Sequence, residues 1–276
     1  MDHVGGFDSF FRSNYHQGPN PNNVWGPPTT ARILHHRFQS YLWNLHETMD
    51  GSWQITDIGP ESLHTMRYEL REAFEVAHDE GSRPCQRTIH EGIGYEVEAV
   101  TLNHGTPSIG YMVREKPRVN VDTKRLNALG LAPGPWMKHL KDGPAPGEVD
   151  AFTVNGVNYS MEALRRELLV TTQGDSIAYL TDFLMDEPTE ERLVEALKGC
   201  QTVVCESQYH QADIELAQRN FHLTSIQPAM MAAKAGIEEL ILFHISTRYQ
   251  RVQWREMLAQ AREIFPKTWY PKHWKI

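Results

Sequence analysis

The second half of the chain alternates short apolar segments with amphipathic ones, and this alternation constrains the fold more than any other feature. Residues 176–181, 202–205 and 240–243 are apolar and β-branched runs of the kind that form buried strands. Apolar positions recur at helical spacing between and after them, which predicts helices at about 190–197, 213–218, 225–235 and 250–264. Strands that alternate with helices indicate an α/β fold built on parallel strands.

Each of these three strands is followed by a residue that can bind metal or move a proton. Asp182 follows the first strand, Glu206 the second and His244 the third. One polar residue after a strand is usually a turn former or a helix cap. However, the carboxyl ends of parallel strands open on a common crevice, so three such residues predict a site there.

The first half of the chain is less regular. Residues 95–102 and 109–114 alternate as strands, and His104 lies in the turn between them. The segment 60–78 is predicted to be a helix, because its apolar positions recur three and four residues apart. From 117 to 174, glycine and proline crowd into a stretch with no long periodic segment. We therefore expect a single domain over 1–276 with an inserted arm at about 117–174 that has no core of its own.

Composition limits the class of protein. A net charge of −8 does not favour a general nucleic-acid binder. No apolar run reaches the 18 residues of a membrane span and no signal sequence is evident, so a soluble cytoplasmic protein is expected. The three cysteines form no CxxC pair, and Cys200 and Cys205 are expected to be buried thiols.

The C-terminal 29 residues depart from the acidic balance. Seven lysines and arginines stand against two glutamates there, interleaved with tryptophans and tyrosines. Such a segment can hold a phosphate backbone and stack bases. The alternative, which we favour, is an amphipathic helix followed by a tail docked on the core.

Several residues supply the donor atoms of a divalent metal site. The sequence has 14 histidines, so a single one is more often a surface or packing residue than a ligand. Five of the imidazole and carboxylate side chains together suit zinc or a similar metal. They lie at the start of the chain, after the strand predicted at 95–102, and after two strands of the second half. These residues are Asp2, His3, His104, Asp182 and His244.

In this order, the motifs resemble the ribonuclease Z branch of the metallo-β-lactamase superfamily, which holds tRNA 3′-processing endonucleases. The similarity runs from residue 1 to about 249. The matching segments are Met1–Asp8, Val24–Pro28, Leu102–Tyr111, Tyr179–Asp182, Cys205–Tyr209, Phe221–Ser225 and Phe243–Tyr249. Each motif alone is a moderate signal, and the ordered set is a strong one.

The resemblance implies an αββα four-layer sandwich and a hydrolytic site with two zinc ions. His104 would belong to one zinc, Asp2, His3 and His244 to the other, and Asp182 would bridge them. A zinc-activated hydroxide would attack the phosphodiester of a precursor tRNA, and Asp2 would orient or deprotonate it. His222 would give a proton to the leaving 3′ oxygen in a relay with Glu206. The resemblance also implies a homodimer.

Met1 falls inside the His-x-His-x-Asp-His motif of that family. We therefore expect a sandwich that lacks its first strands and one firmly bound zinc or none, with poor phosphodiesterase activity. A shortened gene model or gene is the simplest account, and a genuine short form is the rival.

Two departures from the family pattern bear on the substrate. Phe183 replaces a small polar residue and Leu223 a serine, and the arm is only modestly basic. Two alternatives to precursor tRNA cleavage therefore stay open. One is hydrolysis of a small phosphodiester or ester by a related enzyme, and the other is a catalytically incomplete fragment.

Overall fold

The computed structural model describes every residue except 1–3, 17, 19, 143–150, 155 and 276. The chain divides into two compact units. The first unit comprises Met1–Glu91, Val97–Val113 and Ser176–Ile276, and the second comprises Gly92–Glu96 and Arg114–Asp175.

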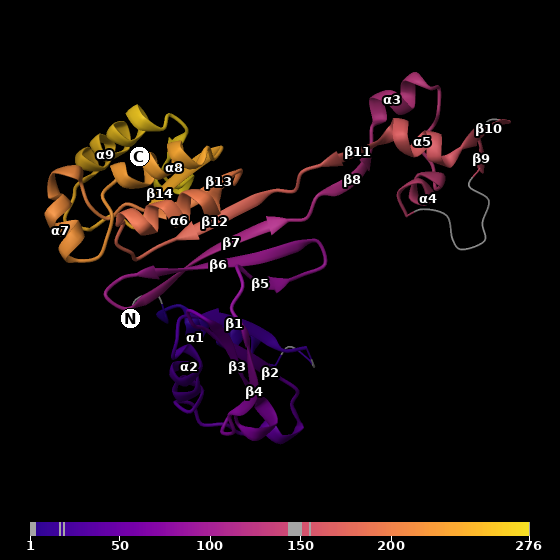
Figure 1. Cartoon of the computed structure of the whole chain (residues 1–276). Coiled ribbons are helices and arrows are strands. Elements are labelled where there is room, and N and C mark those ends of the chain that lie inside the picture. Colours follow the sequence, from indigo (N-terminus) through magenta and orange to yellow (C-terminus); the bar gives the residue numbers. More distant parts are fainter. Residues whose placement is uncertain (1–3, 17, 19, 143–150, 155, 276) are drawn as a thin grey trace. The chain divides into compact units, whose positions relative to one another are not determined.

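A seven-stranded sheet forms the centre of the first unit, in the order β15-β14-β13-β12-β7-β6-β5 (Figure 1). Its strands β12 to β15 are mutually parallel. The strands predicted at 95–102, 109–114, 176–181, 202–205 and 240–243 are confirmed. The bounds are β5 (Thr88–Glu91), β6 (Tyr95–Asn103), β7 (Pro107–Glu115), β12 (Ser176–Leu180), β13 (Thr202–Glu206), β14 (Glu239–Phe243) and β15 (Thr268–Trp269).

The predicted helices of the second half are present too. They are α6 (Glu187–Leu197), α7 (Ile214–Arg219), α8 (Ile226–Ala235) and α9 (Arg251–Ile264). Buried side chains of α6, α8 and α9 join those of β12, β13 and β14 in the largest hydrophobic core, and Figure 1 shows these helices beside those strands. Cys200 and Cys205 lie in this core as buried free thiols, as expected. Trp254, Tyr270 and Trp274 also pack against it, which agrees with a docked C-terminal tail.

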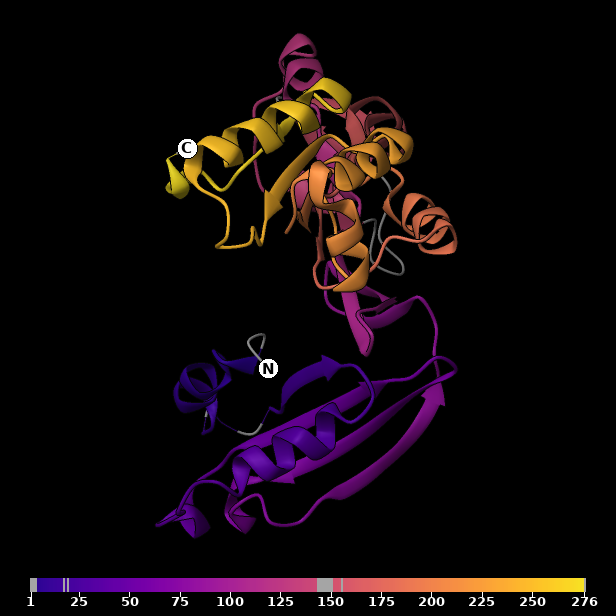
Figure 2. The ribbon, with the colours of Figure 1, turned by 90° about the vertical axis from the view of Figure 1, so that its left-hand side faces the viewer.

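A four-stranded sheet in the order β1-β2-β3-β4 occupies the N-terminal part of the first unit. Its strands are β1 (Asn22–Gly26), β2 (Ser52–Ile58), β3 (Ser62–Glu69) and β4 (His78–Pro84), and its helices are α1 (Phe7–Asn14) and α2 (Thr30–Phe38). Side chains of α1 and α2 pack with β2 and β3 in an aromatic core, and Figure 2 shows α2 along one face of the sheet. Single 3₁₀ turns cover His46–Thr48, Leu70–Glu72, Gln211–Asp213 and Lys272–Trp274.

The helix predicted at 60–78 is wrong. Residues 62–69 are strand β3, which pairs antiparallel with both β2 and β4. Ala73 and Phe74 then adopt positive φ angles of 51° and 55°, which no right-handed helix contains. The apolar spacing resembles that of a helix because both faces of β3 are covered. Leu63 packs in the cluster with Ile109, whereas Met66 and Tyr68 pack in the aromatic core.

Residues from both sheets form a smaller cluster between them. It joins Ile58 and Leu63 of the four-stranded sheet to Ile89 and Ile109 of the seven-stranded one. The Tyr111 hydroxyl also donates a hydrogen bond to the Trp25 carbonyl, at 2.7 Å. The layers therefore run helices, sheet, sheet, helices, which is the αββα sandwich expected from the sequence motifs.

The second unit contains the segment predicted as an inserted arm. Its helices are α3 (Thr123–Ala128), α4 (Trp136–Asp142) and α5 (Met161–Leu168). Two small sheets accompany them, one pairing β8 (Arg118–Val121) with β11 (Leu169–Thr172) and the other pairing β9 (Ala151–Val154) with β10 (Val157–Ser160). Leu126, Trp136, Leu140 and Leu164 are among seven buried residues of a small core. The expectation that the arm lacks a core is therefore wrong, because short helices with few apolar residues each still share one.

No helix in the described part of the chain is long and apolar enough to cross a membrane.

Trp53 lies at the centre of the aromatic core and is fully buried. Its ring contacts those of Phe7, Phe11 and Phe38 at centroid distances of 5.9, 5.1 and 5.9 Å. Trp53→Ala is expected to lower the free energy of unfolding by about 3–5 kcal/mol, because it leaves a cavity that the neighbouring rings cannot fill. Urea unfolding followed by circular dichroism measures this. Leu42→Ala, at a fully exposed position, is the matched control and is expected to change stability by about 0.5 kcal/mol or less.

Candidate active site

Three parallel strands bring the predicted site residues to one edge of the seven-stranded sheet. Leu180 pairs with Cys205, and Glu206 pairs with Phe243, so β12, β13 and β14 end side by side. Asp182 and His244 follow two of these ends in the left-handed region, with φ angles of 53° and 56°. Left-handed backbone is uncommon for residues other than glycine and concentrates at functional sites.

The carboxylate of Asp182 lies beside two histidines. Asp182 Oδ1 is 3.4 Å from His244 Nδ1 and 4.0 Å from His222 Nδ1. One donor atom from each of the three residues lies within 4.8 Å of the other two, a spacing that suits a shared divalent cation. The Thr181 hydroxyl donates to Asp182 Oδ1 at 3.1 Å, and the Ser108 hydroxyl donates to the Asp182 carbonyl at 2.8 Å. The donor set therefore fits a metal ion, and Asp182 is held at its carboxylate by Thr181 and at its backbone carbonyl by Ser108.

Glu206 is fully buried and hydrogen-bonded to His222. Its Oε2 lies 2.9 Å from His222 Nδ1, and its Oε1 accepts the backbone N–H of Phe183 at 2.8 Å. Burial by itself raises the pKa of Glu206, but hydrogen bonds from His222 and His244 and from the Phe183 N–H outweigh it, so the pKa is lowered overall. Glu206 is therefore an ionised carboxylate, and His222 Nδ1–H is the donor.

His104 is the second histidine beside His222. The two rings are 4.6 Å apart between centroids, and His104 Nδ1 is 2.9 Å from the Phe221 carbonyl oxygen. Because a carbonyl can only accept, Nδ1 carries a proton, and Nε2 of a neutral ring keeps a lone pair for a metal. Gly105 makes this approach possible, since its φ is 69° and a Cβ there would stand 3.2 Å from the Phe221 ring.

The structure thus brings together five of the seven residues predicted for the site. These are His104, Asp182, Glu206, His222 and His244. Asp2 and His3 lie outside the described residues, and their assignment as ligands stays a prediction.

Both departures from the expected family pattern have a structural account. Phe183 and Leu223 are fully buried, and each presents its backbone N–H to Glu206, at 2.8 and 3.5 Å. The backbone supplies the contact at these positions, so the apolar side chains pack into the largest core without disturbing Glu206.

Three residues next to the site were not singled out from the sequence. The Tyr209 ring lies 6.1 Å from that of His222, with the Arg248 guanidinium 5.4 Å from its centre. The Ser108 contact to Asp182 was also missed. The one sequence signal for all three is their place within the quoted motifs.

Comparison with known proteins identifies the class first. No protein-family model matches the chain. Among solved structures, the metallo-β-lactamase fold protein YhfI from Bacillus subtilis superposes with a TM-score of 0.50 at 10% identity, covering 98% of this chain and 70% of that one. The fold is therefore the metallo-β-lactamase fold, as the motifs implied.

Sequence relatives then identify the family. The chain is 46% identical to ribonuclease Z of Deinococcus radiodurans over 274 residues, which cover 99% of this chain and 81% of the relative. It is 32% identical to ribonuclease Z of Geobacillus kaustophilus over 232 residues, covering 79% and 68%. The chain belongs to the ribonuclease Z family.

Proposed function

We propose that this chain is a zinc-dependent endoribonuclease that cuts precursor tRNA at the 3′ end of the mature tRNA. The convergence of Asp182, His222 and His244 at one sheet edge carries the proposal, together with membership of the ribonuclease Z family. Asp182 and His244 supply donors for a metal site, and His222 with the buried Glu206 supplies a proton-transfer pair. These are the two elements that phosphodiester hydrolysis needs.

The metal would be held by residues from separate parts of the chain. Asp182, whose carboxylate accepts from Thr181 and whose backbone carbonyl accepts from Ser108, would bridge a pair of ions. His104 Nε2 and His244 would be ligands to one ion each. Asp2 and His3, outside the described residues, are the other proposed ligands from this chain, and Asp2 would orient the attacking water. Bound zinc would lower the pKa of a water and stabilise charge on the phosphate oxygens.

His222 would act on the leaving group. Its Nδ1–H is fixed by Glu206, so Nε2 is free to carry a second proton, and the buried carboxylate stabilises the resulting imidazolium. As the bond between phosphorus and the 3′ oxygen breaks, His222 would pass that proton to the oxygen. The products are a tRNA with a 3′-hydroxyl and a trailer with a 5′-phosphate.

The second unit would be the arm that grips tRNA, with exposed Lys138 and Lys141 on α4 available to phosphates. We further propose a homodimer in the cytoplasm.

Two substrates test the proposal. Zinc-loaded protein is incubated with precursor tRNA that carries a 3′ trailer, and separately with bis(p-nitrophenyl) phosphate. We expect cleavage at the end of the tRNA body, with a 3′-hydroxyl shown by ligation of the product to a 5′-phosphorylated adapter. Hydrolysis of the small diester without cleavage of the RNA would instead favour a small-phosphodiester hydrolase, which the net charge of −8 also suits.

A further inference from the structure

A basic groove runs along α9 and the segment after it. It combines two adjoining hollows that share Leu258 and Arg262. Arg255 lines the first, and Trp269, Lys272 and Lys275 line the second. We call this surface the α9 groove.

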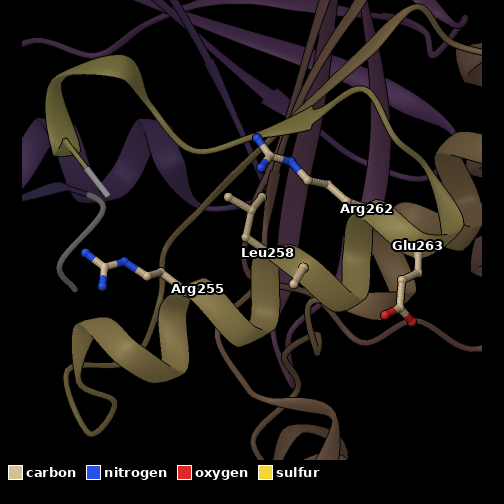
Figure 3. Close-up of a pocket in the computed structure, with 5 residues that line it drawn as sticks. Arg255, Leu258, Arg262 and Glu263 are labelled. Carbon is tan, nitrogen blue, oxygen red and sulfur yellow. The ribbon is translucent and has the colours of Figure 1, made fainter.

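The helix presents two of its three arginines to the same side. Arg255 and Arg262 are seven residues apart, which is about two turns of helix. Figure 3 shows both guanidinium groups on the side of Leu258, with the Glu263 carboxylate pointing the other way. Two acidic residues, Glu239 and Glu263, line the hollows against four basic ones, so the groove is positive in a chain whose net charge is −8.

Most of these cations have no partner of their own. Within the described part of the chain, Arg255, Lys272 and Lys275 take part in no hydrogen bond or ion pair, and all three are exposed. Arg262 differs, because its Nε donates to the Thr268 carbonyl at 2.8 Å and its guanidinium lies 4.7 Å from the centre of the Trp269 ring. Unpaired cations gathered on one surface suit an anionic partner with repeated charges.

Trp269 adds a stacking surface. Its residue is 45% exposed, although Arg262 covers the ring and β15 fixes the backbone by pairing with β14. An exposed, rigidly held indole beside cations is the arrangement that binds unpaired nucleotides, since a base within a duplex has no free face.

The groove lies away from the proposed catalytic residues, within the same unit. Glu239 begins β14 and lines the groove, whereas His244 follows the other end of that strand. At about 3.3 Å per residue, the two ends are on the order of 15 Å apart. A few nucleotides of extended RNA span such a distance.

We propose that the α9 groove binds the unpaired 3′ trailer of the RNA substrate, with phosphates on Arg255, Lys272 and Lys275 and a base on Trp269. The inference rests on the proposed function, because the trailer is the part of a precursor tRNA that lies beyond the cut and outside the folded body. The second unit would hold the tRNA body, and the α9 groove would hold what is removed.

Binding to two RNAs that differ only in trailer length tests this. Fluorescence anisotropy is measured without added metal, so that the RNA stays intact, for precursor tRNA with a 2-nucleotide or a 15-nucleotide trailer. For the double variant Arg255→Ala/Lys272→Ala, we expect weaker binding of the long-trailer RNA and unchanged binding of the short-trailer RNA. The slope of log K against log salt concentration should be smaller in magnitude by about 1.4, because each lost phosphate contact removes roughly 0.7. In Trp269→Leu, the Kd for that RNA should rise about 5- to 150-fold, as for loss of one stacked base.

The control variant is Arg32→Ala/Lys198→Ala, which makes the same change of charge at exposed positions elsewhere. It should bind both RNAs as the parent does, and all variants should hydrolyse bis(p-nitrophenyl) phosphate at the parent's rate. Equal loss for both trailer lengths, or no loss, overturns the trailer site while leaving the proposed function intact. Absence of precursor cleavage by the parent protein overturns the proposed function itself.

Discussion

His244→Ala is expected to lower cleavage of precursor tRNA and of bis(p-nitrophenyl) phosphate by at least about 100-fold, since replacing even the outer partners of metal ligands costs roughly 10- to 100-fold. The imidazole lies 3.4 Å from Asp182 Oδ1 and 3.9 Å from Glu206 Oε2, so its removal takes a donor from the centre of the cluster. Alanine offers no lone pair, and water held there is a weaker ligand than imidazole. Both substrates should be affected equally, because the loss lies in the metal site and not in RNA binding.

Zinc content and thermal unfolding give readouts besides activity. A metal that binds the folded state raises Tm, so zinc should raise the Tm of the parent protein more than that of the variant. His36→Ala is the matched control, because His36 is exposed on α2, outside the site. If His244→Ala kept the parent's zinc content and activity, His244 would not be a ligand.

The site was more predictable from sequence than the N-terminal fold, for a physical reason. Asp182, Glu206 and His244 each follow a strand whose burial and parallel pairing are visible in a local apolar run. Parallel strands in one sheet must end at a common edge, so the convergence follows from local pattern and one topological rule.

Segment 60–78 shows where that inference stops. Its identity as strand β3 is decided by pairing with β2 and β4, which no window around Leu63 and Phe74 contains. The arm shows the same limit, since its core joins Leu126 to Leu164 across 38 residues of chain. Contacts at the site that depend on side-chain direction, such as Ser108 with the Asp182 carbonyl, also needed coordinates.

Glu206→Gln and His222→Ala should each lower kcat by about 10²- to 10⁴-fold, the range for loss of a positioned acid or base, while zinc content and KM stay near those of the parent. Alanine at 222 removes the proton donor itself. Glutamine at 206 keeps the size of the buried side chain and an oxygen for the Phe183 N–H, but it is neutral and cannot stabilise a charged imidazole. It can also turn its NH₂ toward His222 Nδ1, which would reverse the tautomer that proton transfer needs.

The double variant separates a relay from two independent contributions. If Glu206 acts only through His222, then Glu206→Gln/His222→Ala should be no slower than His222→Ala alone, because the carboxylate has nothing left to orient. Glu195→Gln, at an exposed position on α6, is the control for the change of charge. If the two losses of kcat multiply in the double variant, Glu206 acts on a different catalytic step from His222. Loss of zinc from either single variant would show that the replaced residue belongs to the metal site. Zinc content is the necessary measurement for Glu206, because its Oε2 lies 3.9 Å from His244 Nδ1. An unchanged zinc content together with a non-additive loss of kcat would support the relay, because a purely structural role for Glu206 would not produce both results.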